Sequence, residues 1–305
     1  MNRTEKTTQL RGPLSVGQCF TLATIMEATA PKPGNIHRGA DFEDSSYPDF
    51  LVAATLVGPI IDLAVELPLG QTILSAVAAT QAAVATNTNL GTVLLLAPLA
   101  KVPRTASLKH GVVDVLANLG AQDAADVYEA IRLAQPGGLG NVESADVAGA
   151  PPGDLIAAMR LAAERDMIAR QYAHNFQDVF ETVVPWLARA LESRLTQSES
   201  IVRVHLELMS RFPDSLIARR RGVAVAGQAA AMAAAVLAAG KPRDEAYDRG
   251  LADLDFWLRA DGHARNPGTT ADLVAAGLFV ALRDEIIKPP FRLAVLENDE
   301  DPRVN

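Results

Sequence analysis

Apolar positions along the chain recur with a helical period, and no stretch alternates with period two over six residues. The first clear element follows Ser15, which with Gln18 has the spacing of a capping box. An apolar stripe continues from there, and two prolines stop it after Ala30. The pattern therefore predicts a helix over residues 15–30.

The same criteria predict most of the remaining chain as helix. We expect helices over 48–66 with a bend at Pro59, 71–86, 108–119, 123–134, a long tract over 154–195 with a kink near Pro185, and 201–212, 215–239, 242–258 and 270–287. A strand over 93–96 is the alternative for one short apolar piece, but no other segment offers it a partner. The prediction is a single compact multi-helix domain of the all-α class over 15–290. A flexible tail over 1–14 and an acidic tail over 291–305 flank it.

Composition agrees with close helix packing. About one residue in six of the 305 is alanine and only 5% are aromatic, whereas strands favour β-branched and aromatic side chains. A single cysteine, Cys19, argues against a disulfide framework and indicates a reducing compartment, so we expect a cytoplasmic protein. The net charge of −8 argues against nucleic acid as a partner. The most apolar stretch, 223–239, is mostly alanine, which predicts a buried helix and no membrane span.

Polar residues gather where the predicted helices stop. Glu27 lies on the apolar face of the first helix, so its carboxylate needs a basic partner or a metal. The stiff loop Pro31-Lys32-Pro33-Gly34-Asn35 follows, and His37 and Arg38 add positive charge. The loop therefore predicts an anion site, for example for phosphate, although a proline-ended helix with a solvated loop explains the pattern equally well.

Acidic residues come directly after this basic loop. Asp41, Glu43, Asp44 and Asp49 lie within twelve residues of it and predict Mg²⁺ held beside bound phosphates. For Asp49 alone, a place in the first turn of the next helix is the slightly better explanation.

Two more breaker loops carry candidate binding groups. Asn87 and Thr88, followed by Gly91, offer small hydrogen-bonding side chains that suit ribose or phosphate oxygens, or form an ordinary helix terminus. The segment 266–273 approaches a long helix through a Pro-Gly turn, and Thr269 with Asp272 resembles a capping box. We expect the free amides of Gly268 to Thr270 to bind an anion.

The order of these motifs resembles the triphosphoribosyl-dephospho-CoA synthase family over about residues 15–285. The resemblance rests on Glu27 with the Pro-Lys-Pro-Gly loop, on Asn87-Thr88 with Gly91, on Gly137-Gly138, on Asp214 to Gly222, and on Gly268 with Ala271-Asp272-Leu273. It implies an all-α enzyme that moves the triphosphoribosyl unit of ATP to the ribose 2′-hydroxyl of 3′-dephospho-CoA and releases adenine.

The chain differs from better-known members at three places. It has Asp41 where they carry a histidine, Asn89-Leu90 where they carry His-Lys, and Gly268-Thr269-Thr270 where they carry Gly-Gly-x. These differences leave three other functions open. The first is the same chemistry on another acceptor in one-carbon or pterin cofactor biosynthesis. The second is a nucleotide-binding helical module without catalysis, and the third is hydrolysis with water as acceptor.

The resemblance also implies roles for particular residues. Glu27 is the expected base and His37 a candidate proton donor. Mg²⁺ is expected on Asp41, Asp44, Asp49 and Asp272, which otherwise caps its helix. Expected substrate or phosphate contacts are Lys32, Gly34, Asn35, Arg38, Asn87, Thr88, Gly91, Arg221, Gly268, Thr269 and Thr270. ATP and dephospho-CoA or a related acceptor are the expected partners, and the alanine-rich surface suits a homo-oligomer.

Overall fold

The computed structural model describes residues 12–84, 86–136, 147, 149–193, 195–289 and 291. This part of the chain contains fourteen α-helices, one π-helical segment η1 (Val179–Val183) and one short extended segment β1 (Ala260–His263). The helices are α1 (Val16–Thr29), α2 (Tyr47–Asp62), α3 (Leu69–Val84), α4 (Leu90–Lys101), α5 (Leu108–Ala117), α6 (Ala121–Ala134), α7 (Leu155–Ala162), α8 (Met167–Ala173), α9 (Val184–Glu192), α10 (Gln197–Arg211), α11 (Ser215–Arg221), α12 (Val223–Ala238), α13 (Glu245–Arg259) and α14 (Gly268–Arg283). The all-α prediction is confirmed.

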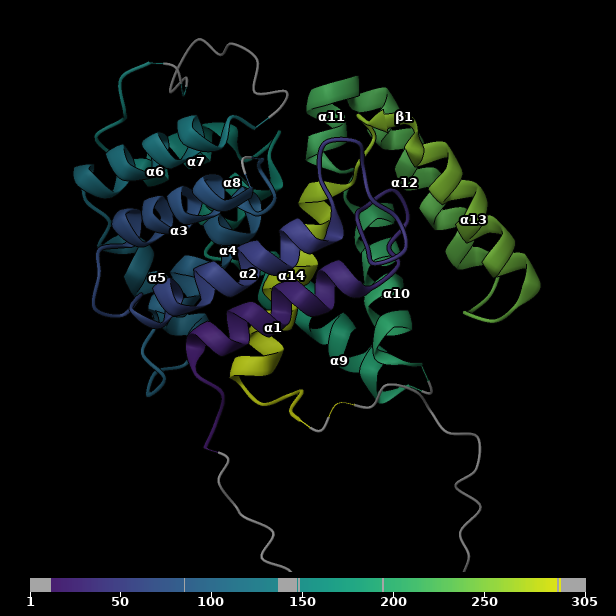
Figure 1. Cartoon of the computed structure of the whole chain (residues 1–305), viewed down its shortest axis with the longest axis horizontal. Helices are drawn as coiled ribbons and strands as arrows, with labels where there is room; N and C mark the ends of the chain where they lie inside the picture. The colour runs from purple at the N-terminus through teal and green to yellow at the C-terminus, as the bar shows by residue number, and fades with distance from the viewer. Residues whose placement is uncertain are drawn as a thin grey trace, which may run out of the picture.

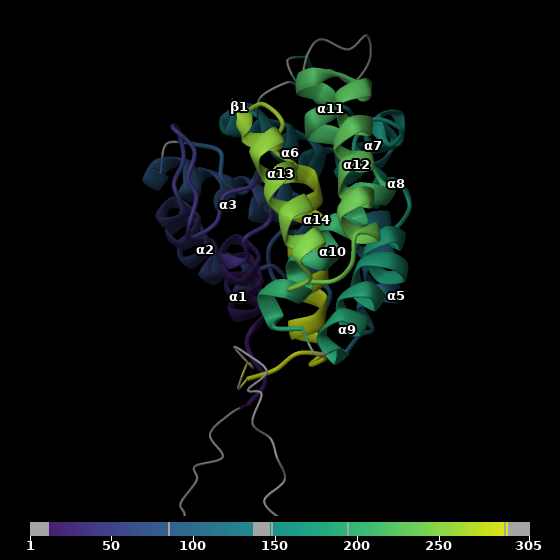
Figure 2. The ribbon, with the colours of Figure 1, turned by 90° about the vertical axis from the view of Figure 1, so that its right-hand side faces the viewer.

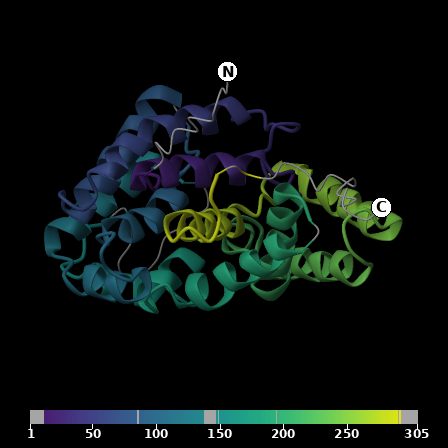
Figure 3. The same cartoon turned by 90° about the horizontal axis from the view of Figure 1, so that it is seen from below.

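Helix α14 forms the centre of the molecule (Figure 1). Its side chains are small or apolar apart from Asp272 and Arg283, and nearly all of them are buried. It packs against α1 and α4 on one side and against α9, α10 and α11 on the other. Two perpendicular views show α1 and α2 in one layer and the green helices in another, with α14 between them (Figures 2 and 3). A helix covered all round in this way holds its polar side chains in fixed positions.

Local capping fixes the ends of several helices as predicted. Ser15 and Gln18 form the reciprocal capping box of α1, and Thr196 with Glu199 forms that of α10. The segment 93–96 is helical within α4, so the strand alternative is wrong. Helix α2 continues through Pro59.

The long tract predicted over 154–195 is wrong in detail, because the chain restarts its helices within it. Asp166 is the N-cap of α8 and accepts hydrogen bonds from the amides of Ile168 and Ala169, at 2.8 and 3.0 Å. A second break follows α8, where Asn175 and Phe176 have positive φ angles of 53° and 61°. The apolar positions keep their spacing across both breaks, which hides them in the sequence.

The single helix predicted over 215–239 is also two helices. Gly222 ends α11 and precedes α12 with a φ of 92°, a backbone conformation that glycine adopts without strain. No helix among the described residues is long and apolar enough to cross a membrane. The predictions for residues 1–11 and 292–305, and the Gly137-Gly138 motif, lie outside the described residues.

Candidate active site

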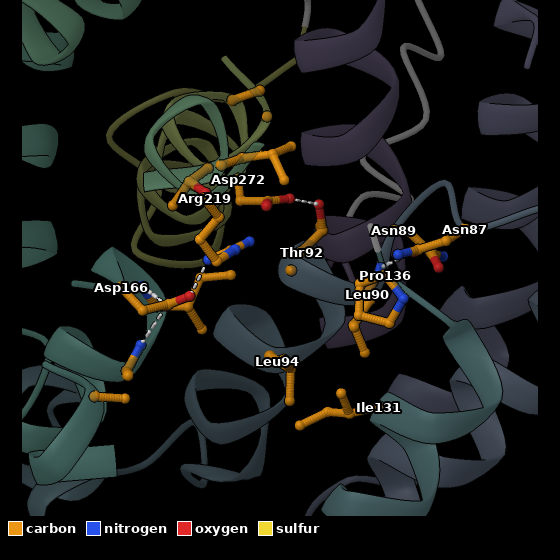
Figure 4. Close-up of a pocket in the computed structure, with 18 of the residues that line it drawn as sticks. Asn87, Asn89, Leu90, Thr92, Leu94, Ile131, Pro136, Asp166, Arg219 and Asp272 are labelled. Carbon is orange, nitrogen blue, oxygen red and sulfur yellow. Dashed lines mark hydrogen bonds and ion pairs between the residues drawn. The ribbon is translucent and has the colours of Figure 1, made fainter. Parts of the chain in front are cut away.

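A pocket of about 300 Å³ opens between the two layers of helices, beside the start of α14 (Figure 4). Helices α1, α4, α6, α7, α8, α11 and α14 all contribute to its wall. Of the residues predicted from sequence to form the site, the pocket is lined by Glu27, Asn35, Asn87, Thr88, Gly91, Gly268, Thr269 and Asp272. Segments from both ends of the chain therefore meet in one pocket.

Asp272 is an acid of this pocket whose pKa is strongly raised. It is the fifth residue of α14, and its Oδ1 accepts a hydrogen bond from Thr92 Oγ1 at 2.7 Å. Burial raises its pKa to about 8, and the nearby Glu27 carboxylate adds to the increase, while the Thr92 hydrogen bond opposes it. The capping role predicted for Asp272 is wrong, because Pro267 is the N-cap of α14. Its carboxyl group keeps its proton to a higher pH than an exposed aspartate does.

Gly91 makes room for that carboxyl group. A Cβ atom at position 91 would lie 2.0 Å from Asp272 Oδ2 and 2.9 Å from Ile168 Cδ1. The Asp272 carboxyl group can therefore take this position only because residue 91 has no side chain.

Glu27 and Lys32 form a buried ion pair. Lys32 Nζ lies 2.9 Å from Glu27 Oε1, and it also donates to the carbonyl oxygens of Glu27 and Ala30. Burial raises the pKa of Glu27 and lowers that of Lys32, and each partner's charge opposes the other's shift. Glu27 lines the pocket, but Lys32 is fully buried behind it and does not. The structure thus makes Lys32 the partner of Glu27 and keeps it away from a bound ligand.

The start of α14 already holds an anion of the protein. Asp214 Oδ2 accepts hydrogen bonds from the amide and the hydroxyl of Thr270, at 2.7 and 2.8 Å. Its Oδ1 accepts from the amides of Leu216 and Ile217 and caps α11. The Thr270 amide expected to bind a ligand is therefore occupied, and Thr270 does not line the pocket. Asp214 joins α11 to α14, so two walls of the pocket are held in register.

Three arginines line the pocket, and neither of the two predicted arginines, Arg38 and Arg221, is among them. Arg165, Arg219 and Arg220 contribute to the wall, whereas Arg221 points to Asp261 outside it. Arg219 forms an ion pair with Asp166 in the wall of the pocket (Figure 4). Arg220 donates to the carbonyl oxygen of His263 at 2.8 Å. Guanidinium groups in such a wall suit phosphate oxygens.

Asparagines and a threonine complete the polar wall. Asn35 donates to Asn266 at 2.9 Å and so ties the loop after α1 to the loop before α14. Asn87 accepts from the amide of Leu90 at the start of α4. Thr88 Oγ1 is buried in the wall and has no hydrogen-bond partner among the described residues. A ligand in the pocket can satisfy this hydroxyl.

Several predicted residues lie outside the pocket and have structural partners. His37 exchanges backbone hydrogen bonds with Ala40, and Arg38 is exposed. Gly34 has a φ of 71°, and its amide donates to Asp255 of α13 at 2.7 Å, so this glycine serves a turn. The structure does not bring His37, Arg38 or Gly34 to the other candidate residues.

The four predicted metal ligands do not converge. Asp41 accepts a hydrogen bond from the amide of Tyr47. Asp49 caps α2 by accepting hydrogen bonds from the amide and the hydroxyl of Ser46. Asp44 faces His263, and only Asp272 lines the pocket. Among the described residues, no three histidine, cysteine or acidic side chains lie close enough to hold a metal ion by themselves. The expected cluster fails because the acidic loop uses its carboxylates to cap its own backbone.

Sequence reasoning missed part of the wall. It gave little weight to Arg219 and Arg220 and overlooked Thr92, Arg165 and Asp166. One signal was available, because Leu216, Arg219 and Arg220 have the i, i+3, i+4 spacing of one helix face, which Arg221 does not share. Asp166 was hidden inside the long tract predicted as one helix.

An all-α fold whose pocket joins buried carboxyl groups to arginines defines an enzyme that acts on a phosphorylated ligand. A family model described as ATP:dephospho-CoA triphosphoribosyl transferase matches residues 13–290, so the chain belongs to this family. It is a transferase, and its family uses ATP and dephospho-CoA as substrates. The family predicted from the motifs is confirmed, and the comparisons give no support to another acceptor or a non-catalytic module.

A solved structure shares the fold. The crystal structure of a proposed triphosphoribosyl-dephospho-CoA synthase from Archaeoglobus fulgidus is similar with a TM-score of 0.60 and 24% sequence identity. The match covers 78% of this chain and 100% of that one. No curated protein sequence matches the chain.

Proposed function

We propose that the pocket beside α14 is where the triphosphoribosyl unit of ATP is transferred to a ribose hydroxyl of dephospho-CoA. The observation that carries the proposal is the pair Glu27 and Asp272. These two carboxyl groups, from opposite ends of the chain, line one pocket, and the Glu27 carboxylate raises the pKa of Asp272. Arginines of α11 line the same pocket, which suits a substrate with a long phosphate chain.

The reaction needs a proton to move while one bond replaces another. The bond between ribose C1 and adenine breaks, a bond between C1 and the acceptor oxygen forms, and the hydroxyl proton ends on adenine. Positive charge develops at C1 in the transition state, which nearby carboxylates stabilise. Two carboxyl groups with different protonation states are the usual solution to this problem.

Asp272 is the group that gives the proton to the departing adenine. With a pKa of about 8 it is mostly protonated at neutral pH, and Thr92 orients one of its oxygens. Glu27 takes the proton of the acceptor hydroxyl, and Lys32 holds its carboxylate in place. Each of these two roles is worth about a hundredfold or more in rate.

The substrate is ATP with its own Mg²⁺. Magnesium bound to a nucleotide keeps its phosphate ligands and needs few protein carboxylates, which agrees with the scattered acids of this chain. Arg165, Arg219 and Arg220 contact the triphosphate, and Asn87 and Thr88 bind the substrate's polar edges.

The setting of the enzyme follows from its composition. Its one cysteine is buried and unpaired with another cysteine, which suits the cytoplasm, and its acidic balance does not suit nucleic acid. Helix α2 exposes Val52 and Leu56, and its C-cap residue Leu63 is also exposed, which supports the predicted self-association. We propose neither a membrane nor a nucleic acid as a partner.

Adenine release tests the proposed function. The purified protein is incubated with ATP and Mg²⁺, with and without dephospho-CoA, and free adenine is measured by chromatography. Adenine that appears only with dephospho-CoA is the expected result. Adenine formed equally without it indicates hydrolysis, and no adenine in either mixture contradicts the proposal. Glu27→Gln is the matched variant, and we expect at least a hundredfold slower release.

A further inference from the structure

The pocket has an apolar compartment, which we call the apolar annex. Its walls come from α4, α6, α7 and α8, and it consists of Leu90, Leu94, Ile131, Met159, Ala162 and Ile168. Leu94 and Ile131 lie together on the side of the pocket away from Asp272 and Arg219 (Figure 4). Four of these six side chains are only partly buried, so apolar surface faces the pocket. Such a surface favours an uncharged group of the ligand.

The apolar annex begins directly beside the acid of the pocket. Thr92, which hydrogen-bonds Asp272, lies between Leu90 and Leu94 on α4. The point above Gly91 is crowded by Asp272 Oδ2 and by Ile168 Cδ1 at once. The end of the annex at Ile168 is therefore next to the carboxyl group of Asp272.

This proximity selects the group that can bind there. Phosphates carry charge and belong with the arginines. The pantetheine arm of dephospho-CoA is separated from the reacting ribose by a diphosphate. An adenine ring is uncharged and flat, and it is bonded directly to the reacting ribose in ATP and to the ribose that carries the acceptor hydroxyl in dephospho-CoA.

The rim of the annex offers a partner for the polar edge of such a ring. Thr88 Oγ1 is buried, lines the pocket and has no hydrogen-bond partner among the described residues. A hydroxyl both donates and accepts, as the edge of adenine requires. Burying a polar group of this kind without a partner is unfavourable, so a ligand that supplies one gains affinity.

We propose that the apolar annex is the adenine-binding compartment of the active site, with Thr88 at its polar rim. The inference rests on the proposed function and adds which part of a substrate the compartment selects. It assigns base specificity to Ile131, Met159 and Ala162, residues that sequence motifs do not mark.

Binding measurements test the assignment without requiring turnover. Ala162→Trp fills the annex, and Ala157→Trp, on the same helix but exposed and outside the pocket, is the matched control. Calorimetry with Mg²⁺ compares ATP with inorganic tripolyphosphate. We expect Ala162→Trp to weaken ATP binding at least tenfold and to change tripolyphosphate binding less than twofold. Ala157→Trp should leave both unchanged. Met159→Asp tests the same point without added bulk.

A second titration, with dephospho-CoA alone, distinguishes the two sources of adenine. If ATP binding falls and dephospho-CoA binding does not, the annex holds the donor's base, and the reverse result assigns the acceptor's base. The proposal is overturned if neither ligand is weakened, or if tripolyphosphate is weakened as much as ATP. A wild-type protein that binds neither nucleotide would overturn the proposed function as well. If the wild type releases adenine, but Ala162→Trp and Met159→Asp bind both nucleotides normally, only the assignment of the annex is overturned.

Discussion

Thr92 donates a hydrogen bond to Asp272 at 2.7 Å and thereby joins α4 to the central helix α14 inside the pocket. One carboxyl oxygen is fixed by this bond, and the other faces the space that Gly91 leaves open. A carboxyl group held by one hydroxyl in a buried wall keeps its proton more readily than an exposed one. The hydrogen bond of Thr92 therefore fixes the position of Asp272, whereas burial of the carboxyl group raises its pKa.

Activity should fall as pH rises through about 8. The pKa of Asp272 lies near that value because of burial, with Glu27, Asp214 and Asp166 adding negative charge around it. Loss of its proton removes the donor to adenine, so kcat should decrease above pH 8. Asp272→Asn keeps the shape and the neutral charge but carries no acidic proton, and we expect at least a hundredfold lower kcat. A variant with near wild-type kcat would contradict the role.

The same pKa shift makes a prediction about stability. A carboxyl group whose pKa is raised by folding binds more protons in the native state, so the free energy of unfolding falls as pH rises. The decrease begins near the unfolded pKa of about 4 and is complete above about 8. Urea denaturation at pH 5 and pH 9 should therefore show a larger loss for the wild type than for Asp272→Asn. An equal loss in both proteins would place the titrating group elsewhere.

Gly91→Ala should damage both stability and activity. Its Cβ would overlap Asp272 Oδ2 at 2.0 Å, so the carboxyl group would have to leave its position. Overpacking of this kind costs about 1–3 kcal/mol. Gly227→Ala is the control, because a Cβ on this glycine of α12 meets nothing within 4 Å. It should stabilise the protein by up to about 1 kcal/mol, since alanine favours helix. Urea midpoints of the two variants check the contrast.

The pair Glu27 and Lys32 should behave as one unit. Removing either partner leaves a buried charge without compensation, which costs about 3–5 kcal/mol. Lys32→Met and Glu27→Gln should each lower the urea midpoint, and the double variant should be much less destabilised than the sum. Additive effects in this double-mutant cycle would show that the pair is not coupled. Glu27→Gln should also reduce turnover in all backgrounds.

Two adjacent arginines of α11 should differ in their effect on ATP. Arg219 lines the pocket, so Arg219→Met should raise the KM for ATP at least tenfold. Arg221 is 43% exposed and pairs with Asp261 outside the pocket, so Arg221→Met should change KM less than twofold. Steady-state kinetics at saturating dephospho-CoA measure both. A larger increase in KM for Arg221→Met than for Arg219→Met would indicate that Arg221 contacts the triphosphate, as the motif predicts.

The sequence carries the local rules of this fold more clearly than its long-range contacts. The capping boxes at Ser15 and Thr196 depend on neighbours three residues away, and they are readable from the chain. The break at Gly222 and the restart at Asp166 interrupt an apolar pattern that itself stays regular, so helix period alone misses them. Propensity and pattern cannot show where a helix is interrupted for packing.

For the site, the motifs predict which residues meet in space, but they do not always predict the role of each residue there. Glu27, Asn87 and Asp272 line one pocket, as their grouping in the motifs suggests. In the sequence, Lys32 resembles a phosphate ligand. Its burial behind Glu27 depends on helices far along the chain, so the motif alone does not show it. The acids from Asp41 to Asp49 resemble a metal site because they cluster in the sequence. Their backbone hydrogen-bond partners in the folded chain cannot be predicted from residue types.

The hydrogen bonds of Asp214 have a consequence for what the pocket can discriminate. Because the Asp214 carboxyl group already accepts the hydrogen bond of the Thr270 amide, a single small anion gains no binding there from this amide. Separate guanidinium groups bind phosphate instead, and several of them bind a chain of linked phosphates more tightly than a single phosphate. Inorganic phosphate at cellular concentrations would then compete poorly with a nucleotide triphosphate for the enzyme.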